Sequence, residues 1–534
     1  NYDNRSTYKA YASTGTLVSG DRGTYSDTST QSKNTYADAI ATLNKSFNDW
    51  SVNVNLGVSL SDSRYEMIGY EGGLKLINFF AVHNIDFNKA WKAKQSGWHD
   101  QTRAIFANAE IGWKSMIYLT ATGRNDWDSR LAFSDYKSFF YPSIGLSAIL
   151  TSMFNAPDWL TYLKVRGSYT EVGNSYGRFM TTVTYPYDEQ TQSWTSTSSY
   201  PNTKLKPERT KSWEVGLDAR ILNDISLNLT YYRSNTYNQT FYADLSLSSG
   251  YSNIPIQSGN IMNEGLEMSL GYNKQWKDFS FNTNYTLTWN KNRVKRLADG
   301  VYNYATGQPI QMPELSPLTY GHTDARLILR VGGSMGDVYG QRLLKRDLNG
   351  YILNEEGVGL AMENKETYLG SILPKMNMGW SLGFGYKGVN LGMTFTGRFG
   401  GIVISETQSV LDAAGVSKVS ADVRDAGGVQ INQSKVSAQT YYQTIQGTAA
   451  YYTYSATNVR LGELSLSYTL PKKWFDNKVG MTVGLVGKNL WMIYCKAPFD
   501  PELTTSAASN FYQGFDAYML PSTRNFGFNV KFQF

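Results

Sequence analysis

The chain has 534 residues, a net charge of +6 at pH 7 and 18% charged residues. A net charge this small, without any basic stripe, argues against nucleic-acid binding. No stretch approaches the roughly 18 consecutive apolar residues that a membrane-spanning helix needs. The single cysteine, Cys495, excludes an intrachain disulfide bond.

Alternating apolar and polar residues predict about 16 β-strands, the first of them near residues 5–18. In the clearest strands one set of alternate residues is apolar and the other is mostly polar or small. The apolar sets are Val52, Val54, Leu56, Val58 and Leu60; Trp213, Val215, Leu217, Ala219 and Ile221; Phe279, Phe281, Tyr285, Leu287 and Trp289; and Val479, Met481, Val483 and Leu485. Strands of about 9–11 residues cross a bilayer when tilted, and these runs are long enough.

Short and long connections alternate between the predicted strands. Tight turns are expected at Asn48-Asp49, Lys114-Ser115, 155–158, Asn223-Asp224, Lys277-Asp278, Lys387-Gly388 and 471–477. Long connections are expected at 19–35, 63–100, 126–137, 173–210, 235–263, 293–375, 400–456 and 490–522. A soluble sandwich has no reason to keep every second connection short, whereas an outer-membrane barrel has short periplasmic turns and long extracellular loops.

The last eleven residues, RNFGFNVKFQF, show the alternation most clearly. One face carries Phe526, Phe528, Val530, Phe532 and Phe534, which suits lipid, and the other face is polar, which suits a wet lumen. We interpret the terminal Phe534 as an assembly signal for membrane insertion. The 39 Tyr and 13 Trp residues also fit a barrel, because both rings favour membrane interfaces. The predicted fold is therefore an all-β, transmembrane antiparallel β-barrel in a bacterial outer membrane.

The N-terminus begins at Asn1 without a signal peptide. Because an outer-membrane protein must be exported, we expect the chain to be the later part of a longer protein. If the last strand runs toward the periplasm, the first strand runs outward, and an even number of strands is expected upstream.

Six segments, in order along the chain, resemble landmarks of the SusC-like TonB-dependent outer-membrane transporters of Bacteroidota. They are NTKLKPERTKSWEVG (202–216), GNIMNEGLEMSL (259–270), residues 370–401 with Leu373-Pro374-Lys375, NVRLGELSLSYTLP (458–471), GKNLWMIYCKAPFDPE (487–502) and residues 521–534. The resemblance spans residues 7–534.

The resemblance implies more than the alternation does. Transporters of this size class have about 22 strands, so roughly six strands and the plug domain are expected outside residues 1–534. The implied function is TonB-dependent active import of a large nutrient, an oligosaccharide or a peptide. The implied partners are the TonB complex, a SusD-like surface lipoprotein that closes the barrel as a lid, the plug and remaining strands of the same protein, and outer-membrane lipid. A passive porin and a non-transport surface barrel such as an adhesin stay open as alternatives.

No enzyme, cofactor or metal centre is predicted. The only histidines, His83, His99 and His322, are scattered over predicted loops without metal-ligand spacing. The segment with Asp347, Asn349 and Glu355 partly resembles a calcium loop, but it lacks the ligand number and glycine spacing of one. The alternative is an acidic loop with an Asn-Gly turn.

The loops 293–375 and 400–456 are too long to be simple connections, since loops above about 12–15 residues are usually functional or disordered. Their candidate lid-contact or ligand-contact residues are Tyr302, Tyr304, Tyr320, Tyr339, Tyr441, Tyr442, Tyr451 and Tyr452. Tyrosine suits such contacts because it offers a large face at low rotamer cost. The same tyrosines are equally expected to pack the loops against each other.

Overall fold

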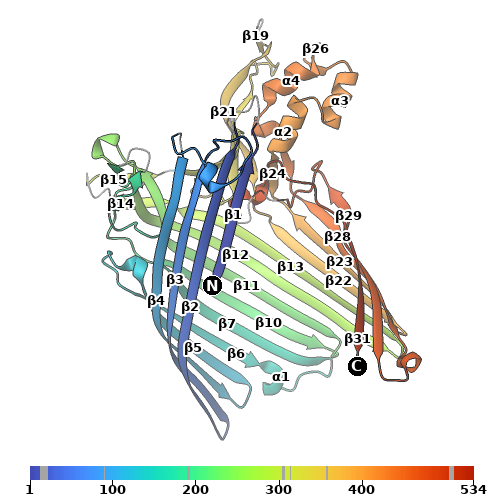
Figure 1. The fold of residues 1–534 in the computed structure, drawn as a ribbon. Coiled ribbons are helices and arrows are strands. Elements are labelled where there is room, and N and C mark those ends of the chain that lie inside the picture. Colours follow the sequence, from blue (N-terminus) through green and yellow to red (C-terminus); the bar gives the residue numbers. More distant parts are fainter. Residues whose placement is uncertain are drawn as a thin grey trace.

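The computed structural model describes residues 1–12, 22–88, 91–188, 193–302, 307–312, 314–355, 359–503, 505 and 510–534. Sixteen antiparallel strands form one curved sheet in which almost every strand pairs with its neighbours along the chain (Figure 1). The sheet confirms the predicted barrel wall. Its strands are β1 (Tyr2–Ala10), β2 (Thr24–Phe47), β3 (Trp50–Gly73), β4 (Trp91–Trp113), β5 (Ile117–Asp128), β6 (Phe139–Ile149), β7 (Leu160–Asn174), β10 (Glu208–Ile221), β11 (Ile225–Asp244), β12 (Asn253–Trp276), β13 (Phe279–Arg296), β22 (Met376–Tyr386), β23 (Val389–Phe399), β28 (Asn458–Leu470), β29 (Gly480–Cys495) and β31 (Asn525–Gln533).

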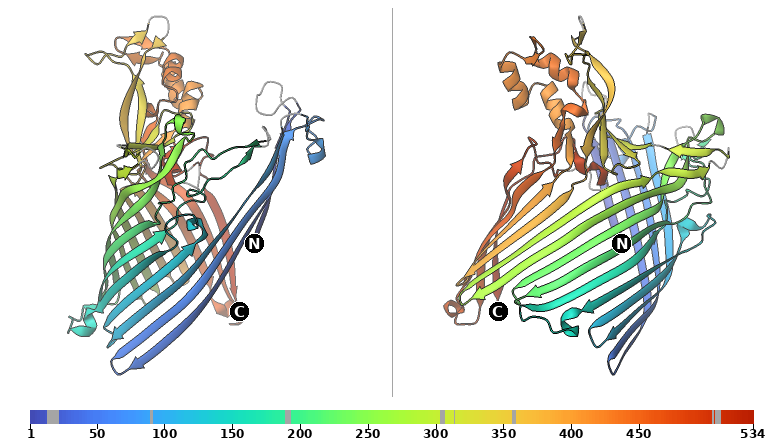
Figure 2. Two further views of the ribbon diagram at one scale, coloured as in Figure 1. Left: turned by 90° about the vertical axis from the view of Figure 1, so that its left-hand side faces the viewer. Right: turned by 180° about the vertical axis from the view of Figure 1, so that it is seen from behind.

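The two ends of the sheet are its edges. In the strand order β1 pairs with β2 alone and β31 with β29 alone, so the sheet is open within the described residues. Figure 2 shows the wall curving around a central space, with the N-terminal and C-terminal strands on either side of the gap.

Short turns join the strands at one end of the sheet, at the bottom of Figure 1. All the predicted tight turns lie there, between β2 and β3, β4 and β5, β6 and β7, β10 and β11, β12 and β13, β22 and β23, and β28 and β29. Asn48, Lys277 and Lys387 open two-residue turns with positive φ angles of 50°, 49° and 47°. Such turns match the twist of the strands they join.

Several predicted long connections are shorter than expected, because the strands continue past the apolar alternation. Residues 63–100 are largely strand, since β3 extends to Gly73 and β4 begins at Trp91. Likewise β2 begins at Thr24, β11 ends at Asp244 and β12 begins at Asn253. Outside the membrane both faces of a strand meet water, so the side-chain pattern is lost while the backbone pairing persists.

Three of the long connections fold into a cap above the sheet, at the end opposite the short turns (Figures 1 and 2). We define the cap as residues 297–375, 400–457 and 496–524. Its elements include the sheet β16-β17-β18-β21, the sheet β27-β24-β30 and three short helices. Their bounds are β14 (Ala298–Tyr302), β15 (Pro309–Met312), β16 (Glu314–Thr319), β17 (Arg326–Arg330), β18 (Asp337–Leu344), β19 (Asn354–Glu355), β20 (Gly359–Leu360), β21 (Met362–Ser371), β24 (Ile402–Ser405), α2 (Glu406–Ala413), α3 (Lys418–Asp425), β25 (Val429–Ile431), β26 (Ser434–Val436), α4 (Ala438–Ile445), β27 (Thr453–Ser455) and β30 (Phe515–Asp516).

A short helix and a small hairpin lie outside both the wall and the cap. The helix α1 (Leu150–Met153) precedes β7 at the turn end, and the hairpin of β8 (Tyr187–Asp188) and β9 (Ser193–Trp194) lies in the loop between β7 and β10. In the described part of the chain, every helix is too short or too polar to cross a membrane.

Candidate functional site: the inner wall and the cap

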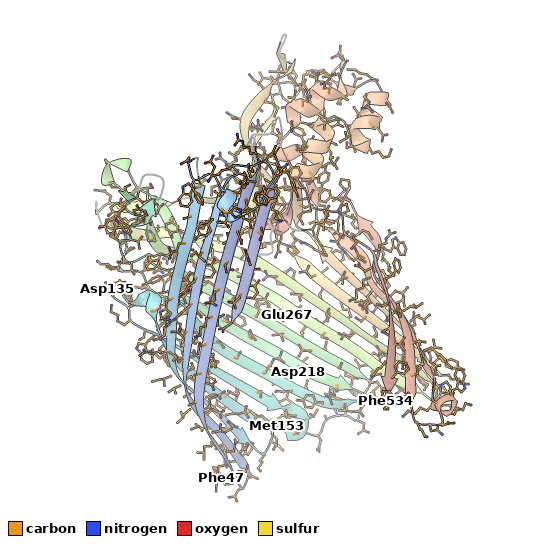
Figure 3. The ribbon with its side chains drawn as sticks, in the orientation of Figure 1. Phe47, Asp135, Met153, Asp218, Glu267 and Phe534 are labelled. Atoms are coloured by element: carbon orange, nitrogen blue, oxygen red, sulfur yellow. The ribbon has the colours of Figure 1, made fainter. Side chains whose placement is uncertain are left out.

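The pairing register places polar residues of the central strands on one face of the sheet, and we interpret this face as the inner one because Val215 and Leu217 lie on the other. Side chains of directly opposed residues share a face, and alternate residues point to opposite faces. On β10 the pairs Asp218–Lys164 and Asp218–Asn228 extend this face to β7 and β11. Its members on five central strands are Lys164, Arg166, Ser168, Glu214, Gly216, Asp218, Asn228, Thr230, Tyr232, Gly265, Glu267, Ser269, Thr286, Thr288 and Asn290. Figure 3 labels Asp218 and Glu267 midway up the wall and Phe47 at its turn end.

A charged network holds the centre of this polar face together. The Arg166 guanidinium donates to Asp218 Oδ2 at 2.7 Å and to Thr230 Oγ1 at 2.6 Å, across three strands. Gly216 leaves room for the arginine, because a Cβ there would lie 2.6 Å from its Nε. The Asn228 amide also donates to Asp218. The arginine is thereby held flat against the wall.

Beside this network the inner wall has a polar hollow of about 390 Å³. Its charged lining residues are Glu110, Lys164, Arg166 and Glu214, and Gly145 and Gly167 form part of its floor. A hollow with both carboxylates and cations suits a ligand, or a packed protein segment, that has hydrogen-bond donors as well as acceptors.

The cap has its own hydrophobic cores. One contains Tyr320, Leu327, Ile372, Ile404 and Phe515, which come from all three of its segments. A second joins Leu344 and Leu360 to Ile431, Tyr442, Ile445 and Tyr452. Because residues nearly two hundred positions apart share one core, the three loops form one folded unit.

The cap helices begin at serine N-caps. The hydroxyls of Ser405, Ser417 and Ser437 accept hydrogen bonds from the backbone N–H groups of Gln408, Ser420 and Thr440. This satisfies one of the free N–H groups in the first turn of each helix. Helices are not among the predicted elements of 400–456. The sequence Ser405-x-x-Gln408 is the one capping-box signal that could have indicated α2.

Polar contacts tie the three cap segments together around Glu406, whose side chain is buried. His322 Nδ1 lies 2.9 Å from Glu406 Oε1, and the Tyr518 hydroxyl donates to the same oxygen at 3.2 Å. Next to it Ser405 donates to Asp516 Oδ2 at 2.6 Å. These contacts fix the start of α2 to the other two segments.

A buried ion pair anchors the cap to the wall. Arg460 on β28 donates to both carboxylate oxygens of Asp500, at 2.9 and 2.7 Å, and both side chains are almost fully buried. Burial acts to raise the pKa of Asp500, but the hydrogen bonds from Arg460 and the Glu502 amide outweigh it and hold that pKa below its usual value. Bidentate arginine–carboxylate pairs are the strong, geometrically specific kind.

The candidate tyrosines fall into three groups, which are buried, half-buried and exposed. Tyr320, Tyr442 and Tyr452 are buried in the cap cores, where they pack against other cap residues. Tyr339 and Tyr441 are half-buried, and the half-buried Tyr451 accepts a hydrogen bond from Leu344 N–H. Tyr302 is exposed. Tyr304 lies outside the described residues.

The calcium candidate forms a turn. Asp347 Oδ1 accepts hydrogen bonds from the backbone N–H groups of Asn349 and Tyr351, at 2.9 and 2.8 Å, as the Asn-Gly turn interpretation expects. Glu355 lies in β19. Among the residues that the structure describes, no three His, Cys, Asp or Glu side chains gather as a metal site.

Two of the three histidines pair with carboxylates other than their sequence neighbours. His99 Nε2 lies 2.7 Å from Asp62 on β3, rather than next to Asp100, and His322 pairs with Glu406 rather than Asp324. Both pairs cross-link elements of the fold.

Three comparisons place these features among known proteins. The chain is 24% identical to TonB-dependent receptor P3 of Formosa agariphila over 93% of its length and 52% of that protein. It is 25% identical to TonB-dependent receptor SusC of Bacteroides thetaiotaomicron over 45% of its length and 22% of that protein. It superposes on a chain of the RagAB peptide importer in the open-open state with a TM-score of 0.76 at 18% identity, covering 99% of this chain and 57% of that one.

The chain thus spans about half the length of these relatives or less. The likeness to the RagAB chain shows the shared fold. A model of the TonB dependent receptor-like β-barrel matches residues 1–490. The chain belongs to the TonB-dependent receptor β-barrel family.

Proposed function

We propose that this chain forms the C-terminal part of the barrel of an active importer, which takes up an oligosaccharide or a peptide across the outer membrane. Family membership places the chain in the outer membrane of a Gram-negative bacterium, in a group of non-enzymatic transport proteins. The fold of the RagAB peptide importer and the relationship to SusC support a large nutrient as the cargo.

The observation that carries the proposal is the folded cap above a polar inner wall. Loops that only connected strands would not need two hydrophobic cores and a buried ion pair. A cap built in this way presents a fixed surface, which suits docking of a rigid partner. We propose that this partner is a SusD-like surface lipoprotein that closes over the barrel. Energy would come from the TonB complex acting on the plug of the full-length protein.

Cells with and without the energy-coupling protein test the transport step. Labelled oligosaccharides and labelled oligopeptides are offered separately to cells that produce the full-length protein. We expect uptake of one class, and its loss when the coupling protein is deleted. Uptake that persists without the coupling protein would favour the porin alternative.

Surface variants test the partner. Val416 and Val419, beside and within α3, are 68% and 50% exposed, and together with Leu411, which is 39% exposed and hydrogen-bonded through its carbonyl to Val416, they place apolar side chains close together on the surface of the cap. Changing both to Glu is expected to reduce co-purification of a surface lipoprotein with the full-length protein. The matched control is Leu222→Glu, because Leu222 is 59% exposed but lies in a turn at the opposite end of the wall. Equal recovery of lipoprotein with both variants would contradict docking at α3.

A further inference from the structure

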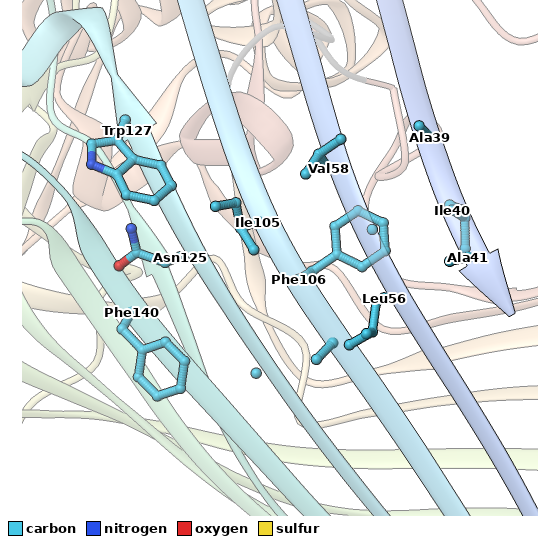
Figure 4. A pocket seen from close by; sticks show the side chains of 13 residues that line it. Ala39, Ile40, Ala41, Leu56, Val58, Ile105, Phe106, Asn125, Trp127 and Phe140 are labelled. Atoms are coloured by element: carbon cyan, nitrogen blue, oxygen red, sulfur yellow. The ribbon is translucent and has the colours of Figure 1, made fainter. Parts of the chain in front are cut away.

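A pocket of about 350 Å³ lies where the wall meets the cap, away from the two free edges of the sheet. It is bordered by the loop that follows β7, by the ends of β10 and β11 that lie far from the short turns, by β16 and β17 of the cap, and by Phe511. The larger depression in Figure 4, of about 860 Å³, is different. It is lined from both faces of the sheet, since the adjacent residues Ala39, Ile40 and Ala41 all border it, along the part of β2 that pairs with β3 alone.

The smaller pocket is on the inner side of the wall. Glu208 is the first residue of β10 and lies six residues from Glu214, so the two side chains share the inner, polar face. Met335, which borders the pocket from the cap, donates its backbone N–H to Asn292 Oδ1 at 2.8 Å, and Asn292 lies two residues beyond Asn290 on the same face. The pocket therefore lies at the mouth of the lumen, beside the route of a cargo. We call it the mouth pocket.

One side of the mouth pocket is apolar. Its residues are Phe241, Leu315, Leu329, Met335 and Phe511. All of these except Phe511 belong to one hydrophobic cluster. Their side chains offer no good hydrogen-bond partner, so a sugar ring, which carries hydroxyls on most of its carbon atoms, would leave hydroxyls unpaired there. An apolar side chain fits this part of the pocket without that cost.

The other side of the mouth pocket has a carboxylate that no cation neutralises. Glu208 is half-buried, and among the described residues it has no ion-pair partner. The nearby Glu171, on β7, shows the usual arrangement, because it pairs with Arg209 at 3.0 Å and with Lys211 at 3.3 Å. Half-buried carboxylates are normally compensated by a cation or by several hydrogen bonds. Glu208 therefore has a place for a cation that a ligand brings.

The surroundings of Glu208 are those of a site that has lost water. Glu208 lies thirteen residues along β10 from Ile221 at the turn end, a height of about 30 Å at a tilt near 45°, which exceeds an apolar band of about 25 Å. At this position, above the membrane-spanning part of the strand, burial raises the pKa of Glu208, and a hydrogen bond with Gln239 offsets this only in part. A protonated amine beside the carboxylate would favour its charged form.

The volume of the mouth pocket limits its ligand to part of a cargo. Ligand pockets are typically about 300–1,000 Å³, so about 350 Å³ suits one or two residues of a chain. The N-terminal residue of a peptide carries a protonated amine and a side chain on the same carbon atom, so a single residue can reach both sides of the pocket. A lysine side chain offers the same amine at the end of an apolar stem.

We propose that the mouth pocket binds a protonated amine together with the apolar group beside it, and thereby selects oligopeptides rather than oligosaccharides as cargo. The amine contacts Glu208, and the apolar group packs on the side formed by Phe241, Leu329 and Met335. This selection presupposes the import function proposed above, whose class of cargo it decides.

Isothermal titration calorimetry of the purified full-length protein tests the mouth pocket. The probes are an octapeptide with an N-terminal leucine followed by alanines and serines, the same peptide with an acetylated N-terminus, and neutral glucose hexasaccharides. We expect the free amine to give about tenfold tighter binding than the acetylated form, a factor that corresponds to about 1.4 kcal/mol and that one hydrogen bond to a charged group can supply. Replacing the leucine by serine is expected to weaken binding several-fold. The hexasaccharides are expected to bind more weakly than the free peptide.

Two variants locate the amine. Glu208→Gln keeps the size of the side chain, and it is expected to bind the free and the acetylated peptide equally. The matched control is Glu264→Gln, a carboxylate on the opposite face of β12, which is expected to keep the wild-type preference. Heat-modifiable migration on a gel confirms that each variant is folded.

A further probe separates the two sources of the amine. It is the acetylated peptide with a lysine in place of the leucine. If it binds the wild-type protein as tightly as the free peptide, and Glu208→Gln removes that gain, the lysine side chain reaches the same carboxylate. If it binds no better than the acetylated leucine peptide, while the free peptide keeps its advantage, the pocket reads the N-terminus.

Three outcomes would overturn the proposal. In the first, no amine-bearing peptide binds the wild-type protein more tightly than the acetylated leucine peptide. In the second, the preference for an amine survives in Glu208→Gln, which would place the amine elsewhere. In the third, a neutral hexasaccharide binds more tightly than the free peptide. Uptake that depends on the energy-coupling protein would leave the importer function standing in all three cases, because these titrations measure binding without transport.

Discussion

At the residue scale, two buried tyrosines of the cap differ in one hydrogen bond. The Tyr320 hydroxyl donates to the Phe511 carbonyl at 2.7 Å, whereas the buried Tyr452 hydroxyl has no partner among the described residues. Tyr320→Phe is expected to cost about 1 kcal/mol, because it removes this hydrogen bond from the cap core. Tyr452→Phe is expected to be neutral or stabilising, because it removes a buried polar atom that is unsatisfied.

Amide hydrogen exchange of the cap measures this difference. For Tyr320→Phe we expect exchange in the cap core to be several-fold faster, and for Tyr452→Phe unchanged or slower. Faster exchange in Tyr452→Phe than in the wild-type protein would mean that the Tyr452 hydroxyl of the wild-type protein has a hydrogen-bond partner in solution.

The turn glycine Gly388 is the second residue-scale case. Its φ of +90° and the Thr469 carbonyl oxygen, which would lie 2.8 Å from an added Cβ, leave no strain-free place for a side chain. Gly388→Ala is expected to destabilise the β22–β23 turn by about 1–2 kcal/mol. The readout is the temperature at which the folded full-length protein changes its gel migration. The control is Gly167→Ala, where the nearest atom to an added Cβ is 3.7 Å away. An equal shift in both variants would contradict the strain at Gly388.

At the element scale, the Arg460–Asp500 pair predicts acid sensitivity of the segment near residues 496–503. Because the folded pKa of Asp500 is below its ordinary value, the pair stabilises the fold above that ordinary value, near 3.8. This stabilisation is lost as the pH falls below 3.8 toward the lower, folded pKa. Asp500→Asn is expected to cost about 2 kcal/mol at neutral pH, since it removes the bidentate partner of the buried Arg460 and leaves it with Glu502 at 3.2 Å and Asn458.

Hydrogen exchange of residues 496–503 at pH 7 and near pH 3 checks the Asp500 prediction, after correction for the intrinsic effect of pH on exchange. Wild type should lose protection at the lower pH, and Asp500→Asn should lack protection at both. Asp422→Asn is the control, because its ion pair with Lys418 is exposed. Protection in Asp500→Asn at neutral pH would show that the pair does not hold this segment.

The final strand carries the assembly prediction. Phe526, Phe528, Phe532 and Phe534 are all more than half exposed on β31 and its end, as a lipid-facing row requires. Deletion of Phe534 is expected to lower the amount of full-length protein in the outer membrane while leaving uptake per inserted copy unchanged. Gln533→Ala, on the other face, is the control. Normal insertion with reduced uptake would make the assembly interpretation wrong.

At the scale of the whole molecule, the two free sheet edges predict the behaviour of the 534-residue segment alone. Lipid cannot satisfy the unpaired backbone groups of β1 and β31. Produced on its own, the segment is expected to aggregate or pair edge to edge, without the heat-modifiable migration of a folded barrel. Stable insertion of the isolated segment would show that the edges can close on each other.

The strands and turns of the wall could be predicted from the sequence because each depends on residues that are close together in the chain. Alternation within β31 and turn residues such as Lys387-Gly388 depend on neighbours in the chain. The extent of β3 beyond the membrane could not be predicted, because the alternation ends where lipid ends. The contacts of the cap could not be predicted either. The partners in each contact, such as Arg460 and Asp500 or His322 and Glu406, are far apart in the sequence and meet only after the loops fold. The buried positions of Tyr320, Tyr442 and Tyr452 depend on the same long-range packing.

The long strands β2 and β3 also set the height of the protein above the cell surface. Beyond the paired residues Ala37 and Leu60 they continue for thirteen residues, to Thr24 and Gly73, or about 40 Å along the strand. If the short turns face the periplasm, as we propose, one side of the mouth is a stiff, paired ribbon that projects outward beyond the neighbouring strands. An antibody or a phage approaching the cell meets this ribbon and the cap before it reaches the bilayer. The loop between β3 and β4 is thus a suitable place for a surface epitope tag.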